Sequence, residues 1–119
     1  MKKLTKIEED IMNRIWKMGP CTVSELISSL DNPQPPHSTI SSVFRSLEKK
    51  EFLTHKAYGR TYLYMPAIEK EAYSGSNIKE IVKNYFQGSA KNLVSFLMKD
   101  KAVSPEELEE LIKKLDNHE

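Results

Sequence analysis

The stretch PHSTISSVFRSLEKKEFLTHKAYGRTYLYMP, residues 36–66, decides the fold of this chain. Its first part has apolar residues at the spacing of one helical face: Ile40, Val43, Phe44 and Leu47. We therefore expect a helix over residues 37–50 that buries this stripe.

The other positions of this predicted helix carry small hydroxyls and a few cations: Ser38, Thr39, Ser41, Ser42, Arg45, Ser46 and Lys49. Small hydroxyl residues are mediocre helix formers, so helix stability does not explain their number. They do allow a helix to approach another surface closely and to hydrogen-bond to it. Phosphates and base edges in a DNA major groove form such a surface. The alternative is an ordinary amphipathic helix with a serine-rich outer face.

Two strand-like segments follow this helix, at residues 53–56 and 61–65. Gly59 lies between them, where a hairpin turn needs positive φ. The basic and aromatic residues at or near the tip are His55, Lys56, Tyr58 and Arg60. A helix followed by such a hairpin has the order of a winged helix, in which the helix enters a groove and the wing follows the phosphate backbone. Candidates for phosphate contacts are Lys49, Lys50, Lys56 and Arg60. His37, at the start of the helix, is a further one, because backbone N–H groups there can also meet a phosphate.

Two more helices are predicted before residue 36. The first opens with a capping-box pattern at Thr5 and Glu8 and ends near Gly19, and the second opens with the same pattern at Thr22 and Glu25. The stripe expected to be buried in the first helix is Ile7, Ile11, Met12, Ile15 and Trp16, and in the second Val23, Leu26, Ile27 and Leu30. Three prolines predict a loop over residues 31–36. Residues 21–22 are a candidate short third strand.

Residues 78–115 predict three short amphipathic helices, and residues 74–76 an interruption or helix start before them. Their apolar stripes include Ile78, Ile81, Val82, Tyr85, Phe86, Leu93, Val94, Leu97, Leu108, Leu111, Ile112 and Leu115. Three helices of this length are too small to bury all these stripes against one another. They could pack on the N-terminal domain or on a second copy of the chain, and we expect the second copy. The predicted domains are residues 1–70, which bind DNA, and residues 71–119, which form a homodimer.

Composition and charge set further bounds. The chain has 119 residues, with 18 Lys and Arg against 17 Asp and Glu. Residues 1–66 hold 10 of these cations and 7 of the anions, whereas residues 67–119 hold 8 and 10, so the net charges are +3 and −2. A positive bias in the half with the predicted recognition helix permits nucleic-acid binding. No apolar run reaches the length of a membrane span, and no signal-peptide pattern is present, so we expect a cytoplasmic protein.

The sequence does not favour an enzyme. It has neither a glycine-rich phosphate loop nor metal-ligand spacing, and its three histidines are scattered. The single cysteine, Cys21, cannot form an internal disulfide, which fits a reducing compartment. We therefore expect no catalytic residues, no bound metal and no cofactor.

Residues in three parts of the chain together resemble one known family. The first is the run from Leu4 to Trp16. The second is the third-helix region, with Thr39-Ile40 and residues 47–52. The third is residues 108–111 near the end. In this order they are similar to the penicillinase and methicillin-resistance repressors (the BlaI/MecI/CopY type). The resemblance implies an N-terminal winged helix, a C-terminal helical dimerisation domain and repression through inverted-repeat operators in promoters.

The resemblance also bears on how repression is relieved. The copper-responsive branch of the family carries a C-terminal Cys-x-Cys pair, which this chain lacks, so copper sensing is not expected. The β-lactam branch is relieved when a sensor protease cuts an Asn–Phe bond in the second C-terminal helix. The corresponding bond here joins Ser95 and Phe96. The alternative is that Phe96 is simply an interface residue.

The prediction is thus a mostly α-helical protein with a small hairpin, acting as a homodimeric DNA-binding repressor with a role in antibiotic resistance. The alternative is a winged helix that serves as a protein-interaction module without sequence-specific DNA binding. Such a protein-interaction module would show no steep salt dependence of DNA binding.

Overall fold

The computed structural model describes the backbone of residues 1–100 and 104–117, and the side chains of residues 1–99 and 104–113. The chain forms two compact units, Met1–Lys70 and Glu71–Glu119. The first contains α1 (Lys6–Met18), α2 (Val23–Ser28), α3 (His37–Lys49), β1 (Leu53–Tyr58) and β2 (Thr61–Pro66). The second is helical, with α4 (Lys70–Tyr85), α5 (Ala90–Asp100) and α6 (Pro105–Asn117). The predicted fold class, mostly α with a hairpin after the third helix, is confirmed.

The helix starts follow the capping patterns. Thr5 Oγ1 accepts a hydrogen bond from the Glu8 backbone N–H at 3.3 Å, while Glu8 Oε1 accepts one from the Thr5 backbone N–H at 2.7 Å. Thr22 and Glu25 form the same reciprocal pair at the start of α2. These bonds satisfy N–H groups that have no partner within the helix. α1 ends at Gly19, whose φ of +85° is easily adopted only by glycine.

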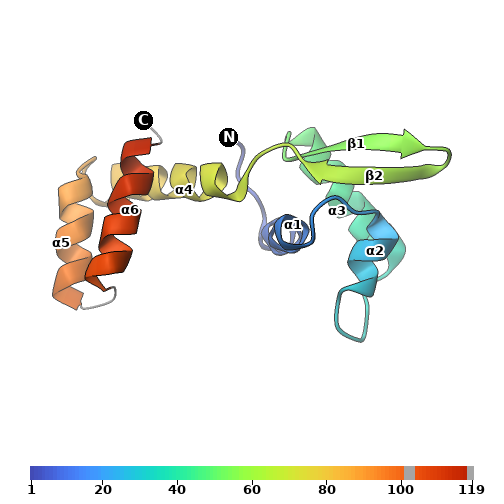
Figure 1. The fold of residues 1–119 in the computed structure, drawn as a ribbon, viewed down its shortest axis with the longest axis horizontal. Coiled ribbons are helices and arrows are strands. Elements are labelled where there is room, and N and C mark those ends of the chain that lie inside the picture. Colours follow the sequence, from blue (N-terminus) through green and yellow to red (C-terminus); the bar gives the residue numbers. More distant parts are fainter. Residues whose placement is uncertain (101–103, 118–119) are drawn as a thin grey trace. The chain divides into compact units, whose positions relative to one another are not determined.

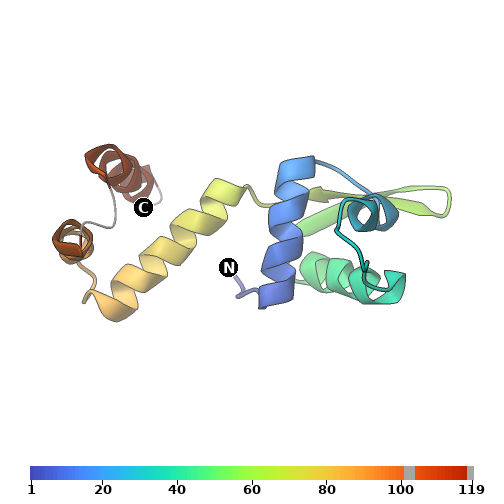
Figure 2. The same ribbon diagram turned by 90° about the horizontal axis from the view of Figure 1, so that it is seen from below.

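The core of the first unit lies between its helices and its hairpin. The largest fully buried side chains are Phe44, Phe52, Met12, Ile15, Leu26, Ile40, Leu47 and Cys21. α3 packs against α1, α2 and β1, so its position is set from three sides. The turn of the hairpin projects past the helices in both Figure 1 and Figure 2.

The buried stripe of α1 differs from the predicted one at both ends. Ile7 is 47% exposed and Trp16 is only half-buried, whereas Glu8 is 4% exposed. The buried face is centred between Glu8 and Ile15, and a residue next to Glu8 is rotated ~100° from it around the helix. Trp16 is held at the edge, where its indole N–H donates to the Ile68 carbonyl at 2.8 Å.

The hairpin is antiparallel and tighter than predicted. Its register runs from Leu53 opposite Pro66 to Tyr58 opposite Thr61, so the loop has only Gly59 and Arg60. Gly59 has a φ of +63°, as the turn prediction requires. The candidate third strand is a single bridge, in which the backbones of Cys21 and Tyr64 exchange two hydrogen bonds of 2.9 and 2.8 Å.

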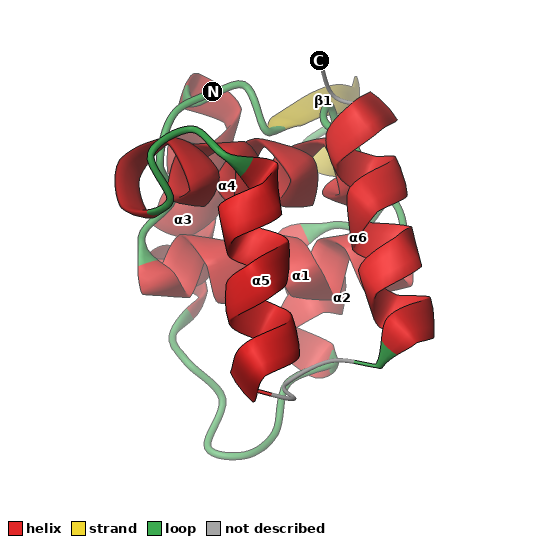
Figure 3. Cartoon of the chain, turned by 90° about the vertical axis from the view of Figure 1, so that its left-hand side faces the viewer, coloured by secondary structure: helices red, strands yellow, loops and turns green. Residues whose placement is uncertain are grey.

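The second unit corrects one prediction and confirms another. α4 begins at Lys70 and runs through residues 74–76 without a break, because one glycine in a helix costs only about 1 kcal/mol and Gly75 is buried within it. α6 begins as predicted, since Ser104 Oγ accepts a hydrogen bond from the Glu107 backbone N–H at 3.2 Å. Figure 3 shows α5 and α6 alongside each other.

Candidate nucleic-acid interface

The outward side of α3 is a continuous polar ridge. It is formed by the exposed side chains Ser38, Ser42, Arg45 and Lys49. They recur at a spacing of three or four residues, which places them in one row along the helix. The opposite face, with Ile40, Val43, Phe44 and Leu47, is buried as predicted. The ridge therefore presents hydroxyls and two cations on a helix whose apolar face is fixed in the core.

The side chain of Arg45 runs along this ridge toward the N-terminus of α3. Its Nη1 donates to Ser41 Oγ at 3.0 Å and its Nη2 to Ser42 Oγ at 3.2 Å. Ser42 and Arg45 are exposed, and Ser41 is half-buried on the side facing the hairpin. The two hydroxyls thus direct the guanidinium toward the N-terminal half of α3.

Ser46 and Lys50 are turned away from the ridge and toward α1. Ser46 Oγ donates to Glu8 Oε2 at 2.5 Å, and Lys50 Nζ donates to Glu8 Oε1 at 2.6 Å and to the Lys3 carbonyl at 3.0 Å. This corrects the expectation that Ser46 belongs to the solvent face and that Lys50 is free for a phosphate. Thr39 is exposed, about a quarter turn from the ridge on the same side as Ser46.

The hydrogen bonds to Glu8 keep its carboxyl group ionised. Burial by itself raises the pKa of a carboxyl group, but the hydrogen bonds from Lys50, Ser46 and Thr5 outweigh it and lower the pKa of Glu8 to about 2. The carboxylate is therefore ionised at neutral pH and ties the end of α3 to the start of α1.

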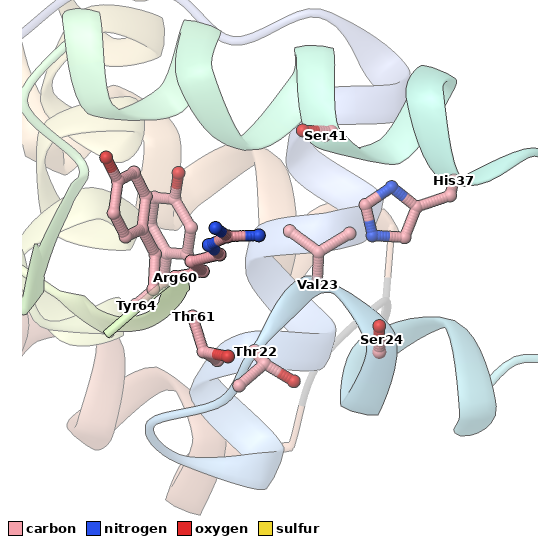
Figure 4. A pocket seen from close by; sticks show the side chains of 9 residues that line it. Thr22, Val23, Ser24, His37, Ser41, Arg60, Thr61 and Tyr64 are labelled. Carbon is pink, nitrogen blue, oxygen red and sulfur yellow. The ribbon is translucent and has the colours of Figure 1, made fainter. Parts of the chain in front are cut away.

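A hollow of about 420 Å³ lies between the starts of α2 and α3 and the strand β2 (Figure 4). It is lined by Thr22, Val23, Ser24, His37, Ser41, Arg60, Thr61, Tyr62 and Tyr64. Six of these carry hydroxyls, two are basic and none is acidic. Figure 4 shows the His37 ring and the Arg60 guanidinium on opposite sides of Val23. A hollow with this lining favours an anion.

The hairpin carries its basic and aromatic residues as the sequence predicts. Lys56, Tyr58 and Arg60 are exposed, with Tyr58 61% accessible. His55 is instead half-buried: its ring stacks on Tyr62 at 4.3 Å between centroids, and its Nδ1 lies 2.5 Å from Glu48 Oε2. His55 therefore braces the hairpin against α3.

Several residues around the hollow were not predicted as site residues. The sequence predicts only a helix start at Thr22 and Ser24. It predicts only a strand at Thr61 and Tyr62. The period of two along β2 puts Tyr62 and Tyr64 on one face, which is the one signal that points to them. Their meeting with His37 depends on how α2, α3 and β2 pack together.

The predicted dimerisation residues fall into three groups in the second unit. Val82, Leu93 and Leu108 are buried within the single chain, while Ile78, Phe86, Val94, Leu97 and Leu111 are half-buried. Ile81, Tyr85 and Ile112 are exposed at 45%, 78% and 41%. The side chain of Leu115 lies outside the described residues. Ser95 and Phe96 are both exposed on α5, and the Phe96 ring lies 5.7 Å from that of Phe86.

Metal clusters and membrane-spanning helices are both absent from the described part of the chain. No group of three or more His, Cys, Asp or Glu side chains is arranged to hold a metal ion there. None of the described helices is both long enough and apolar enough to cross a membrane.

Three helices, a hairpin after the third and an exposed polar ridge on that helix define a winged helix–turn–helix protein. Comparison with known proteins narrows this class. The profile of one family, described as Penicillinase repressor, matches residues 4–117. The chain belongs to this family of transcriptional repressors, which regulate antibiotic resistance and are not enzymes.

Individual relatives agree with this assignment. The chain is 27% identical to the penicillinase repressor of Bacillus licheniformis, over 99% of this chain and 95% of that protein. It is 22% identical to the methicillin resistance regulatory protein MecI of Mammaliicoccus sciuri and to that of Staphylococcus aureus strain N315, in each case over 92% of this chain and 89% of the relative. The family resemblance inferred from the sequence is confirmed.

Proposed function

We propose that this repressor acts as a homodimer that binds inverted-repeat operators in promoters. The observation that carries the proposal is the exposed ridge of α3, which adjoins an anion-favouring hollow and a basic hairpin tip. α3 enters the major groove and the hairpin follows the adjacent backbone. Because the chromosome is its target, we expect the protein to act in the cytoplasm.

Phosphate contacts supply most of the affinity, and they make it depend on salt. The side chains proposed for them are His37 at the start of α3, Lys49 at the end of the ridge, and Lys56, Tyr58 and Arg60 on the hairpin. The side chains proposed for the groove itself are Ser38, Thr39, Ser41, Ser42 and Arg45. Ser46 belongs to neither set, because its hydroxyl is bonded to Glu8, and we assign it the role of holding α3 in place.

The second unit is proposed to form the dimer. Apolar side chains as exposed as Ile81, Tyr85 and Ile112 are costly to leave in water, and a second copy of the chain would cover them. A dimer also matches an inverted repeat, whose half-sites lie about one helical turn (~34 Å) or more apart. One half-site held alone binds far more weakly than two held together.

We further propose that repression is relieved when a sensor protease cuts the bond between Ser95 and Phe96. Both residues are exposed on α5, where a protease could reach them once the helix opens locally. Cleavage would detach α6 from α4 and so weaken the dimer. In the alternative, the exposed Phe96 ring is covered by the partner copy, and the bond is not cut.

A salt titration tests the DNA-binding part of the proposal. The affinity of the purified protein for duplex DNA is measured between low and physiological salt, for wild type, Arg60→Ala and Lys17→Ala. Arg60→Ala should weaken binding and reduce the salt slope by about 1, because one phosphate contact is lost. Lys17, an exposed cation on α1 outside the proposed surface, serves as the control and should leave the slope unchanged. A flat salt dependence in wild type would favour the protein-interaction alternative.

A further inference from the structure

The operator contact that the ridge can make most specifically involves Arg45. α3 holds only two residues with permanent positive charge, Arg45 and Lys49. Lys49 lies in the last turn of the helix, whereas the guanidinium of Arg45 is drawn toward the N-terminal half by Ser41 and Ser42. Lys50 and Ser46 are both bonded to Glu8 of α1, so they do not compete for the groove.

The partners of Arg45 leave it able to bind a base. Two of the five N–H donors of the guanidinium are used on serine hydroxyls, so three remain, the Nε–H among them, and adjacent N–H groups of the planar group can still act as a pair. Serine hydroxyls are neutral, and no described carboxylate forms an ion pair with Arg45. The guanidinium is therefore oriented but not neutralised.

From this geometry we infer that Arg45 reads one guanine in each operator half-site, with Ser41 and Ser42 as its positioning residues. The inference rests on the proposed function. Guanine presents O6 and N7 side by side in the major groove, and two parallel N–H donors of an arginine match them. A guanidinium tethered to two hydroxyls loses less side-chain freedom on binding than a free one.

Arginine can instead bind a phosphate. Removing a phosphate contact weakens binding to all sequences, whereas removing a base contact abolishes the preference for one base. Lysine keeps the charge but lacks the planar pair of donors. Randomised duplexes are therefore selected with full-length wild type, Arg45→Lys, Arg45→Ala and Lys49→Ala. Thermal unfolding of each variant establishes that it is folded.

We expect wild type to enrich a dyad-symmetric sequence with one strongly preferred guanine in each half. Arg45→Ala should lose that preference, by roughly five- to a hundredfold per half-site, and keep the preferences at other positions. Arg45→Lys should keep part of it, because an ammonium can still donate to guanine but lacks the rigid planar fork. Lys49→Ala should weaken binding to all sequences about equally. If Arg45→Ala enriches the same sequences with the same guanine preference, the inference is overturned while the proposed function stands. If wild type enriches no dyad, both fail.

A double-mutant cycle tests the role of the serines. Replacing Ser41 and Ser42 together by alanine should lower affinity for the selected site by about three- to tenfold, since two hydrogen bonds that orient Arg45 are lost. The same replacement in the Arg45→Ala background should have no further effect, because positioning residues act only through the residue they position. Equal losses in both backgrounds would show that the serines contact DNA on their own and would overturn their assignment.

Discussion

The carboxylate of Glu8 lies 2.6 Å from the ammonium of Lys50, and this pair joins the first turn of α1 to the C-terminal cap of α3. Glu8 is buried and its side chain also accepts a hydrogen bond from Ser46. α3 is thus fixed at its C-terminal end by a charged contact and along its length by its apolar face. Its position relative to the hairpin depends on both.

Acid should loosen this contact. Because the pKa of Glu8 is lowered from 4.5 to about 2 in the folded protein, its ionisation contributes stability that is present above pH 4.5 and is lost as the pH falls toward 2. The contribution is about 3 kcal/mol. Chemical denaturation of wild type and Glu8→Gln at several pH values measures it.

Glu8→Gln should be less stable than wild type by about 2 kcal/mol at neutral pH, because Lys50 loses its counter-charge. Its free energy of unfolding should also vary less between pH 4.5 and 2. Parallel pH profiles for the two proteins would mean that Glu8 does not form this contact in solution.

Cys21 should be unreactive in the native protein. Its side chain is 1% exposed, and burial, together with the nearby Glu25 carboxylate, raises the pKa of the thiol to about 11. At pH 8 a maleimide should label the native protein slowly and the denatured protein at once. Rapid labelling of the native protein would contradict the packing of β2 against this residue.

The hairpin turn should tolerate few residues at position 59. Gly59→Ala should destabilise the protein by about 1–2 kcal/mol, because an L-residue at a φ of +63° is strained even though the added Cβ meets no atom within 4 Å. Gly59→Asn is the matched control and should cost less, since asparagine tolerates this conformation. Thermal denaturation compares them, and equal stability of all three proteins would argue against the turn.

The exposed apolar residues of the second unit should be needed for association. Tyr85→Asp or Ile112→Asp should shift the protein from dimer to monomer at micromolar concentration, because a charge would be buried in the interface. Lys83→Asp, which introduces aspartate at an exposed position of α4 about half a turn from Ile81 and Tyr85, should leave the dimer intact. Sedimentation velocity distinguishes the species; an unchanged dimer in both tests would place the interface elsewhere.

Much of the fold could be predicted because local patterns determine it. The capping boxes at Thr5 and Thr22, the glycines at 19 and 59 and the apolar stripe of α3 each specify a local conformation, and the structure agrees with them. The continuity of α4 could not be predicted, because Ser-Gly-Ser at residues 74–76 has the composition of a break in a helix. The cost of Gly75 within a helix is nevertheless small, and tertiary packing overrides it.

The site was predictable only in part, for a different reason. Spacing on a helix shows which residues share a row, but not which hydroxyl meets another element. Ser42 and Ser46 look alike in sequence, yet Ser42 bonds to Arg45 on the ridge and Ser46 bonds to Glu8, 38 residues earlier. Likewise, the hollow between α2, α3 and β2 arises from packing between segments far apart in the chain.

The most direct test of the proposed function is to select genomic fragments with the purified full-length protein at physiological salt, where non-specific binding is weak. We predict recovery of fragments that share a dyad-symmetric site, protected over both halves by a dimer. Recovery of no common sequence from a folded dimer would contradict operator binding and would favour a role in protein interaction.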